Sequence, residues 1–211
     1  MKCIVKNAEP VEFTEWRSLE NLEWQPTYAD LPGEIKESIR ASLMAEQGYI
    51  CCYCEVRLTE KTSHIEHFAP RSTFPQKSLD YQNLLCSCQR ELDRGEPRHC
   101  GSLKGDWYDS RLLVSPLDQG CETRFAYTGD GRIIPADSHD QAAAATILRL
   151  GLDIPKLRDL RAKIIEPFLD DSLTDEDFRR FVFGYLEVDA EGKFGEFWTT
   201  IHHLFGGVEA A

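Results

Sequence analysis

Two pairs of cysteines constrain the fold of this chain more than any other feature of its sequence. Cys51 and Cys54 are separated by two residues, a spacing that lets both thiolates reach one tetrahedral metal ion. Cys88 and Cys100 can supply the second pair, with residues 89–99 between them as an extended loop. Together the four cysteines predict one structural Zn²⁺ ion, which would join two distant segments of the chain.

Buried thiols without a metal are the alternative interpretation of these cysteines. It carries less weight because an acidic chain without an N-terminal signal pattern is expected in the cytoplasm, where clustered cysteines favour metal binding over disulfides. Cys52 and Cys86 lie beside or near the proposed ligands, and either can substitute for one of them. Cys3 and Cys121 are expected to be isolated packed or free thiols.

A second group of motifs lies among the cysteines. Glu66-His67 is an acidic residue followed by a histidine, Asn83-Leu84 precedes Cys88, and Cys100 is followed by Lys104 in a Cys-x-x-x-Lys pattern. This combination resembles the HNH (His-Me finger) nucleases, whose zinc-bound form closes cysteine knuckles around a ββα-metal fold. Within that superfamily, the segments that are most similar to the PtuB family of the Septu anti-phage systems are 51–55, 64–68 and 99–105.

The resemblance implies roles for individual residues. His67 matches the general base that deprotonates a water molecule for attack on a phosphodiester. Glu66 matches the acidic ligand of a divalent ion, Mg²⁺ or Mn²⁺. Asn83 matches the asparagine whose amide pins the loop that aims the histidine. The alternative for His67 is a structural histidine with satisfied hydrogen bonds.

One position departs from the family pattern. The residue after the last zinc cysteine is normally His or Asn, and here it is Gly101, so a second protein ligand has to come from elsewhere. The candidates are His64, His99 and Asp106, and the sequence does not choose among them. Alternation along a strand places His64 and Glu66 on one face and His67 on the other, which makes a His64–Glu66 metal pair sterically easy. The alternative for His64 is a histidine that contacts the phosphate, or that supports a metal ligand without binding the ion itself.

The expected fold is α+β, with a zinc-stabilised ββα-metal (HNH) core, an N-terminal helix and a C-terminal helical segment. Four segments are expected: an N-terminal arm and supporting helix over 1–50, the nuclease core over 51–111, a hairpin connector over 112–139, and an acidic helical segment that docks a partner over 140–211.

Within these segments, hydrophobic periodicity and turn residues place the individual elements. Strands are expected near Ile4 and Val5, in a hairpin over 55–70 that turns at 59–63, over 112–114, and in a second hairpin over 125–134. Helices are expected over 32–47, 100–104, 141–150, 154–169, 174–186 and 194–205. The aromatic residues of the last helix are interpreted as core, with a partner surface as the alternative; they are Phe194, Phe197, Trp198 and Phe205.

Charge limits the ways in which this chain can bind nucleic acid. It contains 24 basic and 36 acidic residues, for a net charge of −12. Residues 51–111 hold nine of each sign, whereas residues 140–211 carry a net charge of −6. Proteins that bind polyanions usually show a basic footprint, so we expect weak autonomous binding and a substrate clamped by another subunit. The basic residues around the site are Arg57, Lys61, Arg71, Lys77, Arg90, Arg94, Arg98, Lys104 and Arg111.

The sequence therefore predicts a metal-dependent endonuclease, with DNA preferred over RNA, as the effector of an anti-phage complex. Resemblance to the PtuB family implies an ABC- or SMC-like ATPase partner of the PtuA type and, in some systems, a retron reverse transcriptase. The chain has no P-loop motif, so ATP chemistry would belong to the partner, and no membrane span is expected. The alternatives are a catalytically weak zinc-stabilised adaptor that binds the ATPase, an RNA (tRNA) nuclease, and a stand-alone restriction or homing nuclease.

Overall fold

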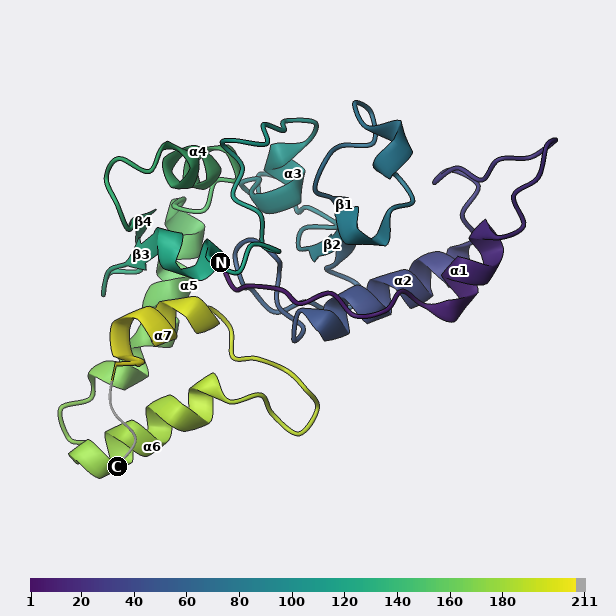
Figure 1. Ribbon diagram of the computed structural model, residues 1–211. Coiled ribbons are helices and arrows are strands. Elements are labelled where there is room, and N and C mark those ends of the chain that lie inside the picture. Colours follow the sequence, from purple (N-terminus) through teal and green to yellow (C-terminus); the bar gives the residue numbers. More distant parts are fainter. Residues whose placement is uncertain (208–211) are drawn as a thin grey trace.

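The computed structural model describes residues 1–207 as helices arranged around two small antiparallel sheets (Figure 1). The α-helices are α1 Val11–Arg17, α2 Gly33–Glu46, α3 Cys100–Lys104, α4 Gln141–Arg149, α5 Pro155–Ile165, α6 Asp175–Leu186 and α7 Trp198–Phe205. The strands are β1 His64–His67, β2 Leu84–Ser87, β3 Phe125–Tyr127 and β4 Ile133–Pro135. Short 3₁₀ turns are η1 Pro75–Lys77, η2 Tyr81–Asn83, η3 Cys121–Arg124 and η4 Glu166–Leu169. Among residues 1–207, no helix has the length and apolar character needed to cross a membrane.

Helix α2 leads directly into the first cysteine pair, and its predicted extent is confirmed. Pro32 precedes the helix, and Ile39 and Leu43 are fully buried on its inner face. The helix ends before Gly48, which adopts a φ of 57°. A Cβ atom at that position would lie 2.2 Å from the Phe194 ring, so glycine satisfies both the backbone conformation and the close packing.

Strand β1 pairs with β2, and the predicted hairpin over 55–70 is wrong. The antiparallel register places Glu66 opposite Leu85 and His67 opposite Leu84. The expected turn forms, because Thr59 and Thr62 exchange backbone-to-hydroxyl hydrogen bonds of 3.0 and 3.2 Å. Residues 55–58, however, fold back on the end of α2 through an isolated bridge between Ile50 and Arg57, so they are not free to pair with β1.

Two further strand predictions are also wrong. Residues near Ile4 are extended but form no strand, and their link to the fold is the hydrogen bond from Ile4 N to Pro116 O at 2.8 Å. The first regular element is instead α1, which the sequence analysis did not predict. Residues 112–114 form a turn and a bend that end at Val114, which is buried and donates its N–H to Thr146 Oγ1 at 2.9 Å.

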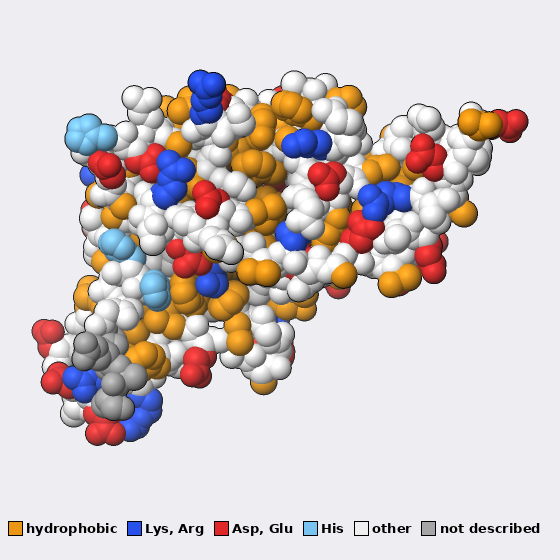
Figure 2. Space-filling model, viewed as in Figure 1, with side chains coloured by type: hydrophobic (Ala, Val, Ile, Leu, Met, Phe, Trp, Pro, Cys, Tyr) orange, Lys and Arg blue, Asp and Glu red, His pale blue; other side chains and the backbone are white. Residues whose placement is uncertain are grey.

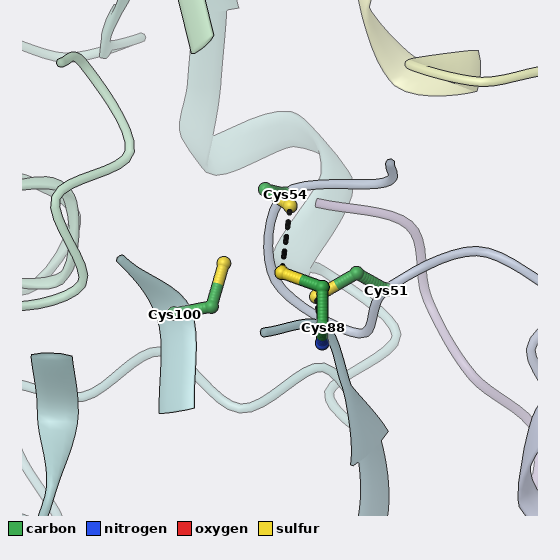
Figure 3. Close-up of side chains that lie close together, drawn as sticks. All are labelled: Cys51, Cys54, Cys88 and Cys100. Atoms are coloured by element: carbon green, nitrogen blue, oxygen red, sulfur yellow. Dashed lines mark hydrogen bonds between the residues drawn. The ribbon is translucent and has the colours of Figure 1, made fainter. Parts of the chain in front are cut away.

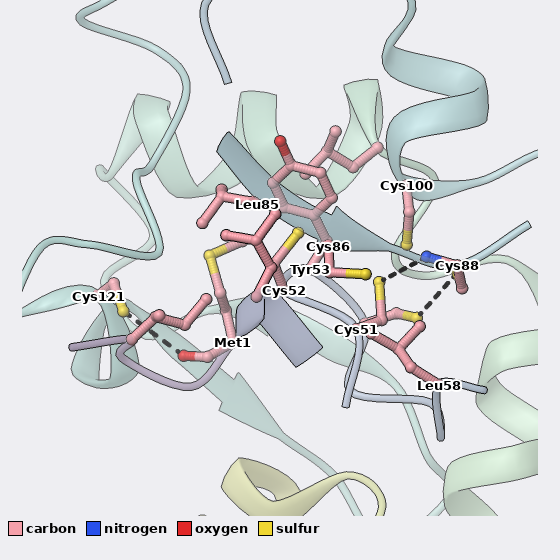
Figure 4. Packing of buried hydrophobic residues seen from close by; sticks show 14 of the residues in the cluster. Met1, Cys51, Cys52, Tyr53, Leu58, Leu85, Cys86, Cys88, Cys100 and Cys121 are labelled. Atoms are coloured by element: carbon pink, nitrogen blue, oxygen red, sulfur yellow. Dashed lines mark hydrogen bonds between the residues drawn. The ribbon is translucent and has the colours of Figure 1, made fainter. Parts of the chain in front are cut away.

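The second half of the chain follows the prediction closely, except that the last helix, expected over 194–205, begins only at Trp198, after Phe197 with a φ of 53°. The hairpin β3–β4 forms, and Asp140 and Thr174 cap α4 and α6 by accepting backbone N–H bonds. Helices α5, α6 and α7 enclose a small apolar cluster. This cluster is separate from the main core, which packs around the cysteine turn and β2 and includes Met1, Tyr53 and Leu85 (Figure 4).

The C-terminal segment is attached to the cysteine turn by specific hydrogen bonds. Phe197 N donates to Glu55 O at 3.1 Å, Thr199 N donates to Glu55 Oε2 at 2.8 Å, and Phe194 N donates to Gly48 O at 3.0 Å. Phe197 is 2% exposed, which confirms the core interpretation for that ring. The other three predicted aromatic residues, Phe194, Trp198 and Phe205, are half-buried. The exposed aromatic rings of this segment lie on α6 instead.

Candidate active site and metal centre

The four predicted cysteines converge, with their sulfurs turned toward one another (Figure 3). All four are buried, and their ligand atoms lie within 4.8 Å of one another. The Sγ atoms of Cys54 and Cys88 are 3.7 Å apart. Thiolates about 2.3 Å from a tetrahedral ion would be separated by roughly 3.8 Å, whereas a disulfide needs about 2.0 Å. The cluster can therefore hold a metal ion, and its spacing suits four thiolate ligands.

Three separate elements bring these cysteines together. Cys51 and Cys54 lie in the turn after α2, which the bond from Glu55 N to Cys51 O closes at 3.0 Å. Cys88 follows β2, and Cys100 opens α3. The wide 89–99 loop between them is irregular, as expected, and the Gln89 side chain braces it: its Oε1 accepts from His99 N at 2.8 Å, and its Nε2 donates to Pro97 O at 2.9 Å.

The remaining thiols and His99 surround this cluster in different ways. Cys52 and Cys86 belong to the apolar core, where burial raises the pKa of the Cys86 thiol to about 12. His99 is also buried, with its Nδ1 3.2 Å from Cys100 Sγ and 3.7 Å from Cys88 Sγ. His99 therefore faces the sulfurs, where it either packs beside the cysteine cluster or can replace one of the cysteines as a ligand. Of the two thiols expected to be isolated, Cys121 is buried and Cys3 is half-buried.

Glu66 lies on β1 and is buried in a polar pocket between three side chains. Its Oε1 atom is 2.9 Å from Lys104 Nζ on α3 and accepts a hydrogen bond from Tyr53 Oη at 3.2 Å. Its Oε2 atom is 3.6 Å from His64 Nε2, which confirms that His64 and Glu66 share one face of the strand. Burial alone would raise the pKa of Glu66, but His64 and Lys104 hold it below its ordinary value. Glu66 is thus a buried carboxylate that stays charged.

His67 points to the other side of β1. Its Nε2 lies 3.0 Å from the carbonyl oxygen of Ser78, and a carbonyl can only accept, so Nε2 carries the proton and Nδ1 carries the lone pair. The Tyr28 ring packs edge-on against the imidazole, with 4.6 Å between ring centroids. Burial, with a smaller contribution from Arg71, lowers the pKa of His67, and the Ser78 carbonyl opposes this shift. The ring is therefore held as a neutral base at neutral pH.

Asn83 connects the end of η2 to the loop that follows β1. Its Nδ2 donates to Ala69 O and Lys77 O, both at 3.0 Å, and its Oδ1 accepts from Ala69 N at 2.8 Å. All of the hydrogen-bonding groups of this buried amide therefore hold the 68–78 loop, which includes the Ser78 carbonyl that orients His67.

The site contains several residues for which the sequence alone predicts no role. Lys104 is part of the Cys-x-x-x-Lys motif, but the motif does not predict that the lysine pairs with Glu66. Tyr53 lies inside the cysteine knuckle and gave no signal of its own. Tyr28 comes from the N-terminal arm, far from His67 in the chain, and also packs against Arg71, whose guanidinium carbon is 5.0 Å from the Tyr28 ring centre. Asp106 is exposed after the end of α3, and no interaction with Glu66 is recorded within residues 1–207.

The basic footprint is smaller than the number of basic residues suggests. Two of the nine basic residues of 51–111 are engaged within the protein. Lys104 is buried in its ion pair with Glu66, and Arg57 donates to the backbone carbonyls of Gly48, Tyr49 and Phe194. On the face shown in Figure 2, basic and acidic side chains are intermixed. Electrostatic attraction to a polyanion therefore depends on the other seven basic residues of this segment, all of which are exposed.

Comparison with known proteins finds similarity to two retron proteins named as HNH endonucleases and to a Septu protein. The chain is 30% identical over 139 residues to the "Retron Vc95 putative HNH endonuclease" of Vibrio cholerae, covering 63% of this chain and 65% of that protein. It is 39% identical over 57 residues to the "Septu protein PtuB" of Bacillus thuringiensis, covering 26% of this chain and 22% of that protein. The "Retron Ec83 putative HNH endonuclease" of Escherichia coli is 25% identical over 207 residues, covering 80% of each chain.

The aligned region spans just under two thirds of the Vibrio cholerae protein and less than a quarter of PtuB. No protein-family model matches the chain. The names of the relatives are nevertheless consistent with the resemblance found in the motifs. Two are named as HNH endonucleases, and the third is a Septu PtuB protein. The chain is therefore related to PtuB and to the retron proteins that are named as HNH endonucleases.

Proposed function

We propose that the chain is a metal-dependent HNH endonuclease that hydrolyses phosphodiester bonds, with DNA as its preferred substrate. The observation that carries the proposal is the arrangement around β1. Glu66 presents a charged carboxylate to one side, and His67 presents a neutral imidazole to the other. The β1–β2 pair and α3, which are joined by Lys104, supply the two strands and the helix of a ββα-metal core. The names of the relatives support the same activity.

The chemistry that follows is assigned to these side chains. His67 Nδ1 takes a proton from a water molecule, and the Ser78 carbonyl stabilises the imidazolium that results. Asn83 acts as a positioning residue because it holds the loop that carries Ser78. Glu66 offers its Oε2 atom to a Mg²⁺ or Mn²⁺ ion, which would neutralise charge on the scissile phosphate and the leaving oxygen. The cysteine cluster would hold a structural Zn²⁺ ion.

We further propose that the protein acts as the effector of an anti-phage complex with an ABC- or SMC-like ATPase and, in retron systems, a reverse transcriptase. The net charge of −12 and the balanced charge of residues 51–111 support this view, because a weak autonomous binder needs a partner to retain its substrate. The proposed docking surface is α6. This helix is acidic in its first turn and exposes Phe181 and Phe183 at 39% and 36%. Aromatic residues are the type that anchors protein interfaces.

Docking cannot be tested by truncation before α4, because α7 and the segment before it are bonded to Glu55 and Gly48 in the cysteine turn. Point substitutions avoid this problem. Phe183→Ser should weaken co-purification with the ATPase, whereas Leu22→Ser, at a fully exposed apolar residue of the N-terminal arm, should not. Equal recovery of the complex with both variants would place the docking surface elsewhere.

The nuclease proposal is tested by purifying the chain with and without the ATPase and assaying cleavage with Mg²⁺ or Mn²⁺. Supercoiled plasmid and transfer RNA serve as parallel substrates. The substrate that is cleaved faster decides between the hypotheses of a DNA nuclease and an RNA nuclease. His67→Ala should reduce cleavage by about 10²–10⁴-fold. His139→Ala is the matched control, because this histidine side chain is 92% exposed. Complex formation without cleavage of either substrate would support the adaptor alternative instead.

A further inference from the structure

Helix α3 passes so close to Glu66 that position 101 has no room for a side chain. A Cβ atom on Gly101 would lie 2.5 Å from Glu66 Oε2 and 2.9 Å from His64 Nε2. Gly101 is not among the glycines with positive φ, so its backbone conformation does not require glycine. The backbone is also fixed in place, because Gly101 N donates to Ser87 Oγ at 3.2 Å. Glycine is therefore favoured here because the Glu66 carboxylate and the His64 imidazole lie where a side chain at position 101 would be.

The two oxygens of Glu66 have different surroundings. Lys104 and Tyr53 both hold Oε1, which fixes the plane of the carboxylate. Oε2 instead faces His64 Nε2 at 3.6 Å, a separation too long for a hydrogen bond. Two ligand atoms that are each about 2.0–2.2 Å from one ion are separated by roughly 3–4 Å, so the observed distance suits a shared ion.

Within residues 1–207, no hydrogen bond to a protein group holds the His64 imidazole in this place. Its Nδ1 atom is buried and lacks a hydrogen-bond partner within the described part of the chain, and its Nε2 atom faces Glu66 without bonding to it. A polar ring in such a position usually has a partner. Of the other candidates, His99 faces the cysteine sulfurs and Asp106 is an exposed residue after the end of α3.

We propose that His64 Nε2 and Glu66 Oε2 together bind the divalent ion, and that Gly101 keeps the space for this pair open. The inference rests on the proposed function for the identity of the ion as Mg²⁺ or Mn²⁺. Both ligands come from β1, and α3 contributes to the metal site by having no side chain at this point.

The test uses the full chain with its cysteine-bound metal retained and one equivalent of Mn²⁺ added. Electron spin echo envelope modulation detects an imidazole nitrogen bound directly to Mn²⁺, and titration calorimetry gives the affinity. The wild type should show the nitrogen signal. His64→Gln should abolish it and weaken Mn²⁺ binding by about 10-fold or more. His139→Gln, at the exposed histidine, should change neither quantity.

Gly101→Ala provides an independent test, because it keeps both ligands but places a methyl group where they lie. It should weaken Mn²⁺ binding to a similar degree while the cysteine-bound metal stays in place. If this variant does not fold, the half-buried and more tolerant His64 position still decides the question.

Glu66→Gln separates failure of this inference from failure of the proposed function. Loss of Mn²⁺ binding in Glu66→Gln, together with a persistent nitrogen signal in His64→Gln, would overturn the assignment of His64 and leave the metal-dependent nuclease intact. Undiminished Mn²⁺ binding in Glu66→Gln would show that the ion does not bind at this carboxylate, which would overturn both.

Discussion

Replacing Lys104 with methionine would isolate the buried charge pair that joins β1 to α3. The Lys104 and Glu66 side chains are 1% and 9% exposed, and their charged atoms are 2.9 Å apart. The ammonium group also donates to His67 O and Gly105 O, both at 3.2 Å, so all three of its hydrogen-bond donors are used. Methionine retains most of the apolar stem but leaves the Glu66 carboxylate without its closest cation.

The magnitude follows from the cost of an unpaired buried charge. Removing one partner of a buried ion pair costs about 3–5 kcal/mol. In a chain of this size, 1 kcal/mol shifts the melting temperature by about 2–4 °C, so Lys104→Met should lower it by roughly 6–20 °C. Glu66→Gln should cost less, because Lys104 keeps its two carbonyl acceptors. The double variant removes both charges and should be more stable than Lys104→Met by about 1 kcal/mol or more.

Thermal unfolding followed by circular dichroism, without added divalent ions, measures these differences. Lys61→Met is the matched control, because Lys61 is exposed and its loss should change stability by no more than about 0.5 kcal/mol. A double variant that is no more stable than Lys104→Met would refute the reasoning, since the carboxylate would then not depend on the lysine charge.

Three further predictions test other parts of the site. Cys88→Ser should release about one equivalent of metal, measured by elemental analysis, and lower the melting temperature, because a structural metal contributes folding free energy; metal-free wild type with an unchanged melting temperature would contradict this. Asn83→Ala should speed amide hydrogen exchange across 68–78 and slow cleavage while the cysteine-bound metal stays, and unchanged exchange would exclude a positioning role. Tyr28→Ala should reduce cleavage and Tyr28→Phe should not, because the contact with His67 is made by the ring and not by the hydroxyl.

Elements with local signals are the ones that the sequence predicts well. Helix α2 is framed by Pro32 and Gly48, and α6 begins with a capping box in which Thr174 Oγ1 accepts from Asp177 N at 3.1 Å. The Cys51 and Cys54 pair also lies within one turn. In each case, the residues that determine the structure are neighbours in the chain, so their pattern is visible without knowledge of the fold.

The strand partner of β1 depends on contacts that no local pattern reveals. Residues 84–87 are buried at all four positions, so they lack the alternation that marks a half-exposed strand. Residues 55–58 look like a suitable partner because a good turn follows them, yet they are taken up by the bridge to the end of α2. Tyr28 reaches His67 in the same non-local way, from an arm with no recognisable motif.

Gly101 shows why a missing ligand in a motif is weak support for a missing activity. A sequence motif is checked one position at a time, and at position 101 the glycine stands where the family pattern has a metal ligand. A metal ion responds only to the atoms around it, and here the His64 imidazole, supplied by β1, lies 2.9 Å from where a Cβ atom at position 101 would be. A side chain at 101 would displace this ring or the Glu66 carboxylate, so the observed His64–Glu66 arrangement is sterically incompatible with a larger residue at that position. With His64 as the second ligand, as proposed above, the glycine is its expected companion and does not favour the adaptor alternative over the nuclease.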